Sequence, residues 1–152
     1  MFEVHIYITI DKKTPRPQER NYGYVLETKV LENTRTREGF GTINGTYHKA
    51  VLVALIEAMG RINQSCQVHI HTEDTFILNM IENNVHKWAE KDFEGEIANK
   101  EEWQQLWGLV TKHIITPSPG SHTYDSWLKN EMVKMVSDTV NSRSGGFPEG
   151  GR

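Results

Sequence analysis

Residues 68–81, "VHIHTEDTFILNMI", decide the fold, because a strand turns into a helix within them. Apolar and polar side chains alternate over "VHIHT", and this period of two predicts a β-strand. The apolar spacing that follows predicts a short helix over residues 73–83. Two carboxylates, Glu73 and Asp74, fall at the join between the two elements.

The rest of the chain predicts four more strands and four more helices. We expect strands at residues 3–10, 22–32, 37–43, 66–71 and 114–117, and helices at 47–62, 73–83, 85–89, 99–113 and 121–140. The Asn-Gly pair at residues 44 and 45 predicts a turn. Three consecutive strands followed by helical crossovers indicate an α/β fold, with a mixed sheet and helices on both faces.

Composition limits the class of protein. The chain has 152 residues, 37% hydrophobic and 24% charged, which fits one globular domain. A net charge of −3 argues against a general nucleic-acid binder but leaves a local basic patch open. Cys66 is the single cysteine, so no intrachain disulfide is possible.

Neither the first residues nor any apolar run indicates a signal peptide or a membrane span. We therefore expect an intracellular, cytoplasmic protein without membrane contact. The end of the chain, "NSRSGGFPEGGR", is rich in Gly, Ser and Pro, which predicts a disordered tail at residues 141–152 after a domain at 1–140.

Several strings resemble the bacterial type of the ribonuclease H family, in the same order and over roughly residues 2–140. They are "IYITI", "NYGYVL", "AVLVALIEAM", "CQVHIHTEDTFILNMI", "VHKWAEKDF", "NKEEWQQLW" and "SHTYDSWL". The resemblance implies an RNase H-like α/β fold with a five-stranded mixed sheet. It also implies cleavage of the RNA strand of RNA–DNA hybrids by four carboxylates around two Mg²⁺ or Mn²⁺ ions.

Carried over residue by residue, the carboxylate set is incomplete. Asp125 matches the family's final Asp, and Glu73 stands at the strand-four Asp with Asp74 beside it. Val51 falls at the helix Glu, and a shifted alignment would put His48, Lys49 or Ala50 there, none of them a carboxylate. Asp11 comes one residue after the strand-one position. The resemblance therefore implies Asp11, Glu73 and Asp125 as metal ligands, with Asp74 assisting.

Side-chain alternation places Asp11 on the same face of its strand as Thr9 and Tyr7. It places Glu73 on the same face as His69 and His71. If the two strands are neighbours, as in the family, these polar sets face one way and Asp11 and Glu73 can meet. A β-bulge in either strand would instead turn one of the two carboxylates away.

The binding elements of the family also differ here. The stretch that follows the third helix, "WAEKDFEGE", is acidic on balance, whereas the family has a basic protrusion there. His122 stands in the loop where family members carry a mobile His. Four basic residues of the first loop are candidate phosphate contacts instead: Lys12, Lys13, Arg16 and Arg20.

Structural interpretations stand beside these functional ones. Asp74 fits a helix N-cap, Asp125 a first-turn helix acid and Asp11 a turn residue. The imidazoles at positions 5, 69 and 71 fit either hydrogen-bonded surface residues or a transition-metal site. Trp88, Trp103 and Trp107 fit core positions.

Two functions remain open. The missing helix carboxylate and the acidic protrusion favour an RNase H-like domain with a degenerate catalytic site, acting as a nucleic-acid-binding or protein-interaction module. The alternative is a divalent-metal-dependent endonuclease for RNA–DNA hybrids. The expected partner is an RNA–DNA hybrid or RNA; the sequence names no protein partner.

Overall fold

The computed structural model describes residues 2–145, and side chains for residues 2–136. Five strands and five helices follow one another along this part of the chain. They are β1 (Glu3–Ile10), β2 (Gln18–Val30), β3 (Asn33–Gly45), α1 (Tyr47–Met59), β4 (Gln67–Thr72), α2 (Thr75–Asn83), α3 (Val85–Glu90), α4 (Lys100–Val110), β5 (Ile114–Pro119) and α5 (Asp125–Gly145).

The strands form one mixed sheet in the order β3-β2-β1-β4-β5. β2 pairs antiparallel with both β1 and β3, whereas β4 runs parallel to β1 and β5. The expected five-stranded mixed sheet is therefore confirmed, with β1 and β4 as direct neighbours. Their carboxyl ends meet at one edge, where the sequence places its acidic residues.

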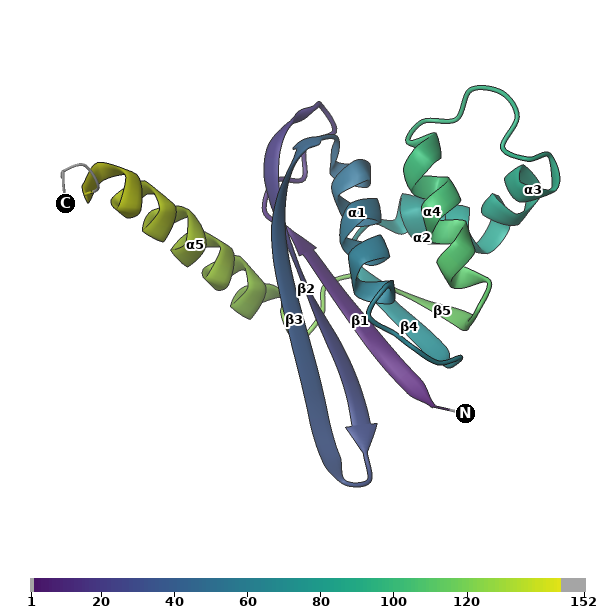
Figure 1. Ribbon diagram of the computed structural model, residues 1–152, viewed down its shortest axis with the longest axis horizontal. Coiled ribbons are helices and arrows are strands. Elements are labelled where there is room, and N and C mark those ends of the chain that lie inside the picture. Colours follow the sequence, from purple (N-terminus) through teal and green to yellow (C-terminus); the bar gives the residue numbers. More distant parts are fainter. Residues whose placement is uncertain (1, 146–152) are drawn as a thin grey trace.

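α1, α2 and α4 lie on one face of the sheet (Figure 1). α1 packs on the first three strands and on α4, and side chains such as Leu52, Leu55 and Leu106 are fully buried between them. Trp103 is buried, and Trp88 meets it edge-on with ring centroids 5.4 Å apart. The expected core role of these tryptophans is confirmed.

α5 covers the opposite face only in part. Its Leu128 and Met132 pack against Tyr7 of β1 and Val25 of β2 in a second, smaller core. Beyond these residues the helix projects away from the sheet (Figure 1), and Val133 and Val136 are exposed. None of the helices in residues 2–145 is long and apolar enough to cross a membrane.

Three predicted boundaries are corrected. The β2–β3 hairpin is longer than expected and turns at Leu31, which has φ 61°. The turn predicted at Asn44 and Gly45 is wrong, because both residues belong to β3. Gly45 ends β3, because Thr46 follows as the N-cap of α1 and accepts a hydrogen bond from the Lys49 amide. α5 starts at Asp125 instead of residue 121, and it continues through residue 145; residues 146–152 of the predicted tail lie outside the described residues.

Candidate functional site

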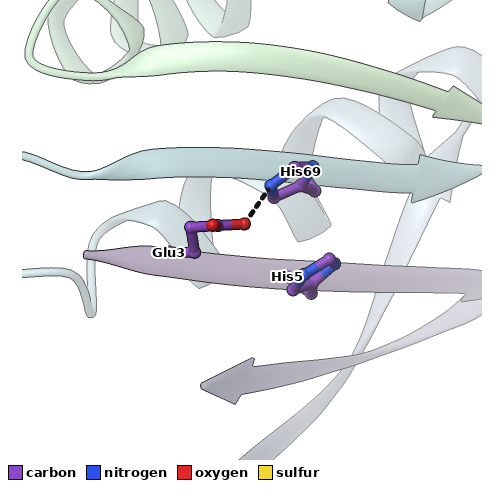
Figure 2. A group of neighbouring side chains, drawn as sticks. All are labelled: Glu3, His5 and His69. Atoms are coloured by element: carbon purple, nitrogen blue, oxygen red, sulfur yellow. Dashed lines mark hydrogen bonds and ion pairs between the residues drawn. The ribbon is translucent and has the colours of Figure 1, made fainter. Parts of the chain in front are cut away.

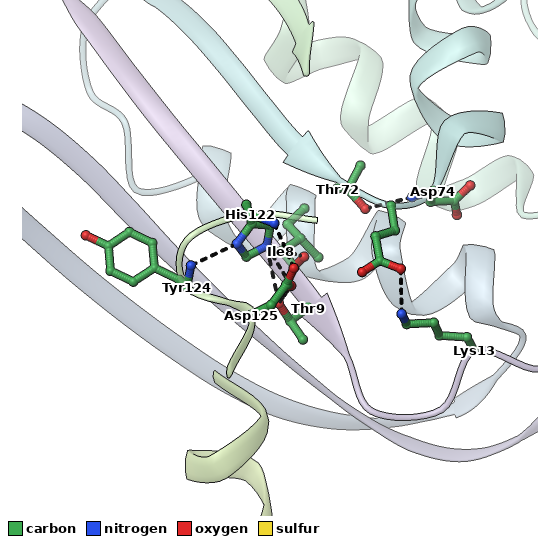
Figure 3. Close-up of polar contacts among 9 residues, drawn as sticks. Ile8, Thr9, Lys13, Thr72, Asp74, His122, Tyr124 and Asp125 are labelled. Carbon is green, nitrogen blue, oxygen red and sulfur yellow. Dashed lines mark hydrogen bonds and ion pairs between the residues drawn. The ribbon is translucent and has the colours of Figure 1, made fainter. Parts of the chain in front are cut away.

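The candidate site lies where β1 and β4 end side by side and α5 begins. β1 and β4 are in parallel register, with Tyr7 opposite His71, so the polar residues that follow on each strand approach the same edge. The loop from residue 120 brings His122 and Asp125 to this edge from the far side (Figure 3).

Asp125 is the centre of a hydrogen-bonded cluster. Thr9 Oγ1 donates to Asp125 Oδ1 at 2.5 Å, and the His122 amide donates to Asp125 Oδ2 at 2.7 Å. His122 Nε2 lies 2.9 Å from the Ile8 carbonyl, which can only accept, so this nitrogen carries the proton. His122 Nδ1 accepts from the Tyr124 amide at 3.2 Å, and only 3% of the imidazole is exposed. The His122 ring is therefore fixed in place, which does not suit a mobile residue.

Asp11 does not join this cluster. Both of its carboxylate oxygens accept from Asn21, Oδ1 from the backbone amide and Oδ2 from the side-chain amide, each at 2.9 Å. Asp11 is one same-face step beyond Thr9, which is about 7 Å further along an extended chain. The alternation expected for β1 is thus present, but Thr9 and not Asp11 meets Asp125.

Asp74 caps α2, as its structural interpretation predicts. Its Oδ1 accepts from the Ile77 amide at 3.1 Å. Its Oδ2 lies 2.6 Å from Nδ1 of His48 on α1, and the carboxylate is almost fully buried. Since the capped amide and the imidazole use both oxygens, Asp74 is held as a structural pair with His48.

Glu73 projects from the end of β4 and is paired with Lys13. The Lys13 ammonium lies 2.5 Å from Glu73 Oε1, and both side chains are partly exposed. Figure 3 shows Lys13 reaching this edge from the β1–β2 loop. The Glu73 carboxylate, which the resemblance assigns to a metal ion, therefore forms an ion pair with Lys13.

Two aromatic residues at the start of α1 belong to the site but were not expected from the sequence. Burial raises the pKa of Tyr47 well above its usual range, and the charges of Asp74, Glu73 and Asp125 add to the shift. Negative charge from this edge of the sheet thus acts on the Tyr47 phenol. His48 precedes Val51 by one helical turn and shares its face, a spacing that was visible in the sequence.

No described carboxylates form a three-ligand group. Over residues 2–136, the His, Cys, Asp and Glu ligand atoms that lie within 4.8 Å of one another in a group of three belong to Glu3, His5 and His69. Val51, at the position of the helix carboxylate, has no exposed surface. Within residues 2–136, Asp11, Glu73 and Asp125 therefore do not bring three ligand atoms within this distance of one another.

The basic residues of the β1–β2 loop divide into two kinds. Arg20 is fully buried, and its guanidinium donates to the carbonyls of Gly45, Lys12 and Arg16. This corrects its expected role, because no part of Arg20 is free to contact a phosphate. Lys12, Lys13 and Arg16 are exposed.

A row of rings runs along the same face from the opposite end of β1. His5 stacks on His69 with centroids 4.3 Å apart, and Tyr7 stacks on His71 at 4.2 Å, which confirms that these polar sets face one way. Burial lowers the pKa of His71 to about 4, and it also lowers the pKa of His5. Both imidazoles are therefore neutral at neutral pH.

Comparison with known proteins places this geometry in a family. The RNase H family model matches residues 11–118, more than half of the chain. The chain belongs to the RNase H family. The family match ends before Asp125 and begins after Thr9, so the cluster that joins β1 to α5 lies outside it.

Curated relatives of this RNase H-family chain are ribonucleases H. The chain is 26% identical to the ribonuclease H of Campylobacter jejuni over 95 residues, which cover 62% of each protein. It is 27% identical to that of Rhizobium meliloti over 120 residues, or 76% of each. The chain thus spans about three fifths of the length of the Campylobacter relatives.

Solved structures support the same fold. LC9-RNase H1, described as a type 1 RNase H with the type 2 active-site motif, gives a TM-score of 0.67 at 18% identity, over 90% of this chain and 70% of that one. The RNase H domain of PFV gives 0.60 at 12% identity, over 86% and 92%. A foamy viral protease-reverse transcriptase in complex with an RNA/DNA hybrid gives 0.52 at 16% identity, over 79% of this chain and 18% of that one.

Proposed function

We propose that this RNase H-family domain binds nucleic-acid duplexes, with an RNA–DNA hybrid as the expected ligand, and that its catalytic site is degenerate. The observation that carries the proposal is Val51. A buried aliphatic side chain stands where the resemblance implies a metal-binding Glu. A valine offers no ligand atom, and an acid could not replace it there without a cost for burial.

The other carboxylates support the proposal because each already has partners within the chain. Lys13 forms an ion pair with Glu73, and the Asn21 side chain donates a hydrogen bond to Asp11. Asp125 accepts from Thr9 and from the His122 amide. The Lys13 ammonium would have to leave Glu73 before a metal ion could take its place, whereas the hydrogen bonds to Asp11 and Asp125 leave lone pairs on each carboxylate.

Binding requires a cationic surface, and the β1–β2 loop supplies it beside the site. Lys12 and Arg16 are exposed there, and Lys13 reaches the end of β4. Phosphate contacts by such residues supply most of the affinity for duplexes. The foamy viral structure with an RNA/DNA hybrid makes a hybrid the first ligand to test.

The test is binding of a fluorescent RNA–DNA hybrid, measured by anisotropy at several salt concentrations. We expect Lys12→Gln combined with Arg16→Gln to weaken binding about tenfold or more and to reduce the salt slope by about 2, one for each lost phosphate contact. A matched control, Lys29→Gln with Arg35→Gln, changes the far end of the hairpin and leaves binding intact. Equal affinity of the wild type and the loop variant for the hybrid would contradict the proposal. A wild-type protein that does not bind hybrids would favour a protein-interaction module instead.

One observation favours the second candidate, a divalent-metal-dependent endonuclease. The charges of Asp74, Glu73 and Asp125 add to the raised pKa of Tyr47, as expected where acidic residues share one edge of a sheet. In that case Asp11, Glu73 and Asp125 would be the metal ligands and Asp74 would assist. Cleavage of the hybrid with Mg²⁺ or Mn²⁺, lost in Asp125→Asn, distinguishes this candidate from the first.

A further inference from the structure

Three potential ligands gather at the start of β1 and β4, away from the carboxylate edge. Glu3 and His5 alternate onto the same face of β1, and His69 pairs directly with His5 across the parallel ladder (Figure 2). One ligand atom from each of the three lies within 4.8 Å of the other two. Ligand atoms around a tetrahedral zinc ion are about 3.4 Å apart, so a small contraction completes the set.

The orientation of His5 fits a metal ligand. His5 Nδ1 lies 2.9 Å from His71 Nε2, and this contact leaves His5 Nε2 as the nitrogen available to a metal ion. Metal-binding imidazoles in proteins almost always use their second nitrogen in a hydrogen bond, which fixes ring and tautomer. His71 therefore acts as the supporting residue and not as a ligand.

His69 is also held toward the cluster. Its Nε2 lies 2.8 Å from Glu3 Oε1, and the imidazole is only 19% exposed while the carboxylate is 57% exposed. A carboxylate that already accepts from an imidazole nitrogen can exchange that proton for a metal ion without moving far. One partly buried imidazole and one exposed carboxylate also leave the site open to solvent on one side.

There is room for an ion and a water molecule. A surface hollow of about 520 Å³ adjoins the cluster, lined by Phe2, Glu3, His5, Glu27, Thr28 and Lys29. Glu27 is the partner of His5 on β2, so a second carboxylate stands on the other side of His5. Lys29 lines the same hollow, so His5 has both negative and positive charges near it.

The rings of His5 and His69 stack almost parallel, with planes 8° apart. Their lone pairs converge on one ion when the His69 ring rotates about its Cβ–Cγ bond, a torsion with broad freedom in histidine. The contact with His71 meanwhile holds His5 in place. Metal binding would therefore replace the stack.

We propose that Glu3, His5 and His69 form a zinc site with solvent as the fourth ligand. Imidazole nitrogens with one carboxylate oxygen suit zinc and not magnesium. The ion would link the first residues of β1 and β4. The carboxyl ends of the same two strands form the candidate functional site. Glu3 and Thr9 are about 20 Å apart along β1, so this site is separate from the carboxylate edge.

The experiment is titration of chelator-stripped, tag-free protein with ZnCl₂ by calorimetry, and with CoCl₂ by visible absorption. We expect one equivalent of Zn²⁺ to bind and the Co²⁺ form to show the intense bands of a four-coordinate site. His69→Gln and Glu3→Gln should each weaken Zn²⁺ binding at least tenfold. His86→Gln, on an exposed position of α3, is the matched control and should bind as the wild type does.

The fold of each variant is checked by its melting temperature in the presence of EDTA. Zn²⁺ should raise the melting temperature of the wild type and of His86→Gln, because it binds only the folded chain, but not that of His69→Gln. Equal Zn²⁺ affinity in wild type and folded His69→Gln would overturn the proposal. So would a wild-type melting temperature that Zn²⁺ leaves unchanged at saturating concentration.

Discussion

Arg20 shows at the scale of one residue why a basic side chain in a loop is not always a binding residue. Its guanidinium ties the β1–β2 loop to the end of β3 through three backbone carbonyls.

We expect Arg20→Met to lower the free energy of unfolding by about 2–4 kcal/mol, because hydrogen bonds from a charged donor are lost and the Gly45 carbonyl stays buried. Urea denaturation measures this. Arg35→Met, at an exposed position of β3, should change it by less than about 0.5 kcal/mol. A loss below about 1 kcal/mol for Arg20→Met would show that the loop does not depend on it.

His71 should make stability depend on pH. Its pKa is about 4 in the folded chain, mainly from burial and also from His5 and His122, against an ordinary value of 6.5. Because the unfolded chain takes up a proton at a higher pH than the folded chain, stability is complete above pH 6.5 and falls as the pH drops toward 4. Melting temperatures in EDTA measure this slope, which His71→Gln should reduce. A slope that is the same in His71→Gln would contradict the assignment.

The sequence predicted the neighbourhood of the site better than its contacts. Glu73 and Asp74 follow the end of β4, Asp125 begins α5, and the face shared by the polar residues of β1 and β4 was predicted correctly. Side-chain alternation could not predict which residue on this face of β1 lies opposite the start of α5. Thr9 occupies that place because the register between strand and helix depends on packing across the sheet, which no local pattern records.

The β2–β3 hairpin makes a prediction at the scale of an element. Leu31 turns the chain with φ 61° while its side chain is 93% exposed, so a leucine stands in the left-handed region with little packing to compensate. We expect Leu31→Gly to raise the free energy of unfolding by about 0.5–1 kcal/mol, since glycine adopts this conformation without strain. Glu32→Gly is the control, because Glu32 has no positive φ, and it should destabilise by a similar amount. Thermal unfolding of the two variants should move in opposite directions; a lower melting temperature for Leu31→Gly would contradict this account of the turn.

Elements with strong periodicity were predicted well, and their ends were not. The helix at residue 47 and the strand at residue 3 begin where the sequence places them. The Asn-Gly pair misled because it precedes a helix cap and does not join two strands, whereas the true turn has no turn-forming residue. α5 begins late because Asp125 accepts from the His122 amide, a bond that closes the loop just before the helix.

For the molecule as a whole, the fold is that of the family, whereas in our proposal the acidic edge does not carry the family's hydrolytic chemistry. The sheet order and the family match make this an RNase H-family domain. Along its edge, the carboxylates form an ion pair with a lysine and hydrogen bonds with a histidine, an asparagine and a threonine. In our account the family architecture persists as a scaffold for binding, and the hydrolytic centre does not.

The most direct test of this account is single-turnover cleavage of an RNA–DNA hybrid labelled at the 5′ end of its RNA strand. Protein is held in excess over hybrid, with Mg²⁺ or Mn²⁺, and a ribonuclease H with a complete carboxylate set serves as the positive control. The account predicts that the hybrid is bound but that its RNA strand is cut no faster than without protein. Cleavage that requires the metal ion and disappears in Asp125→Asn would contradict it.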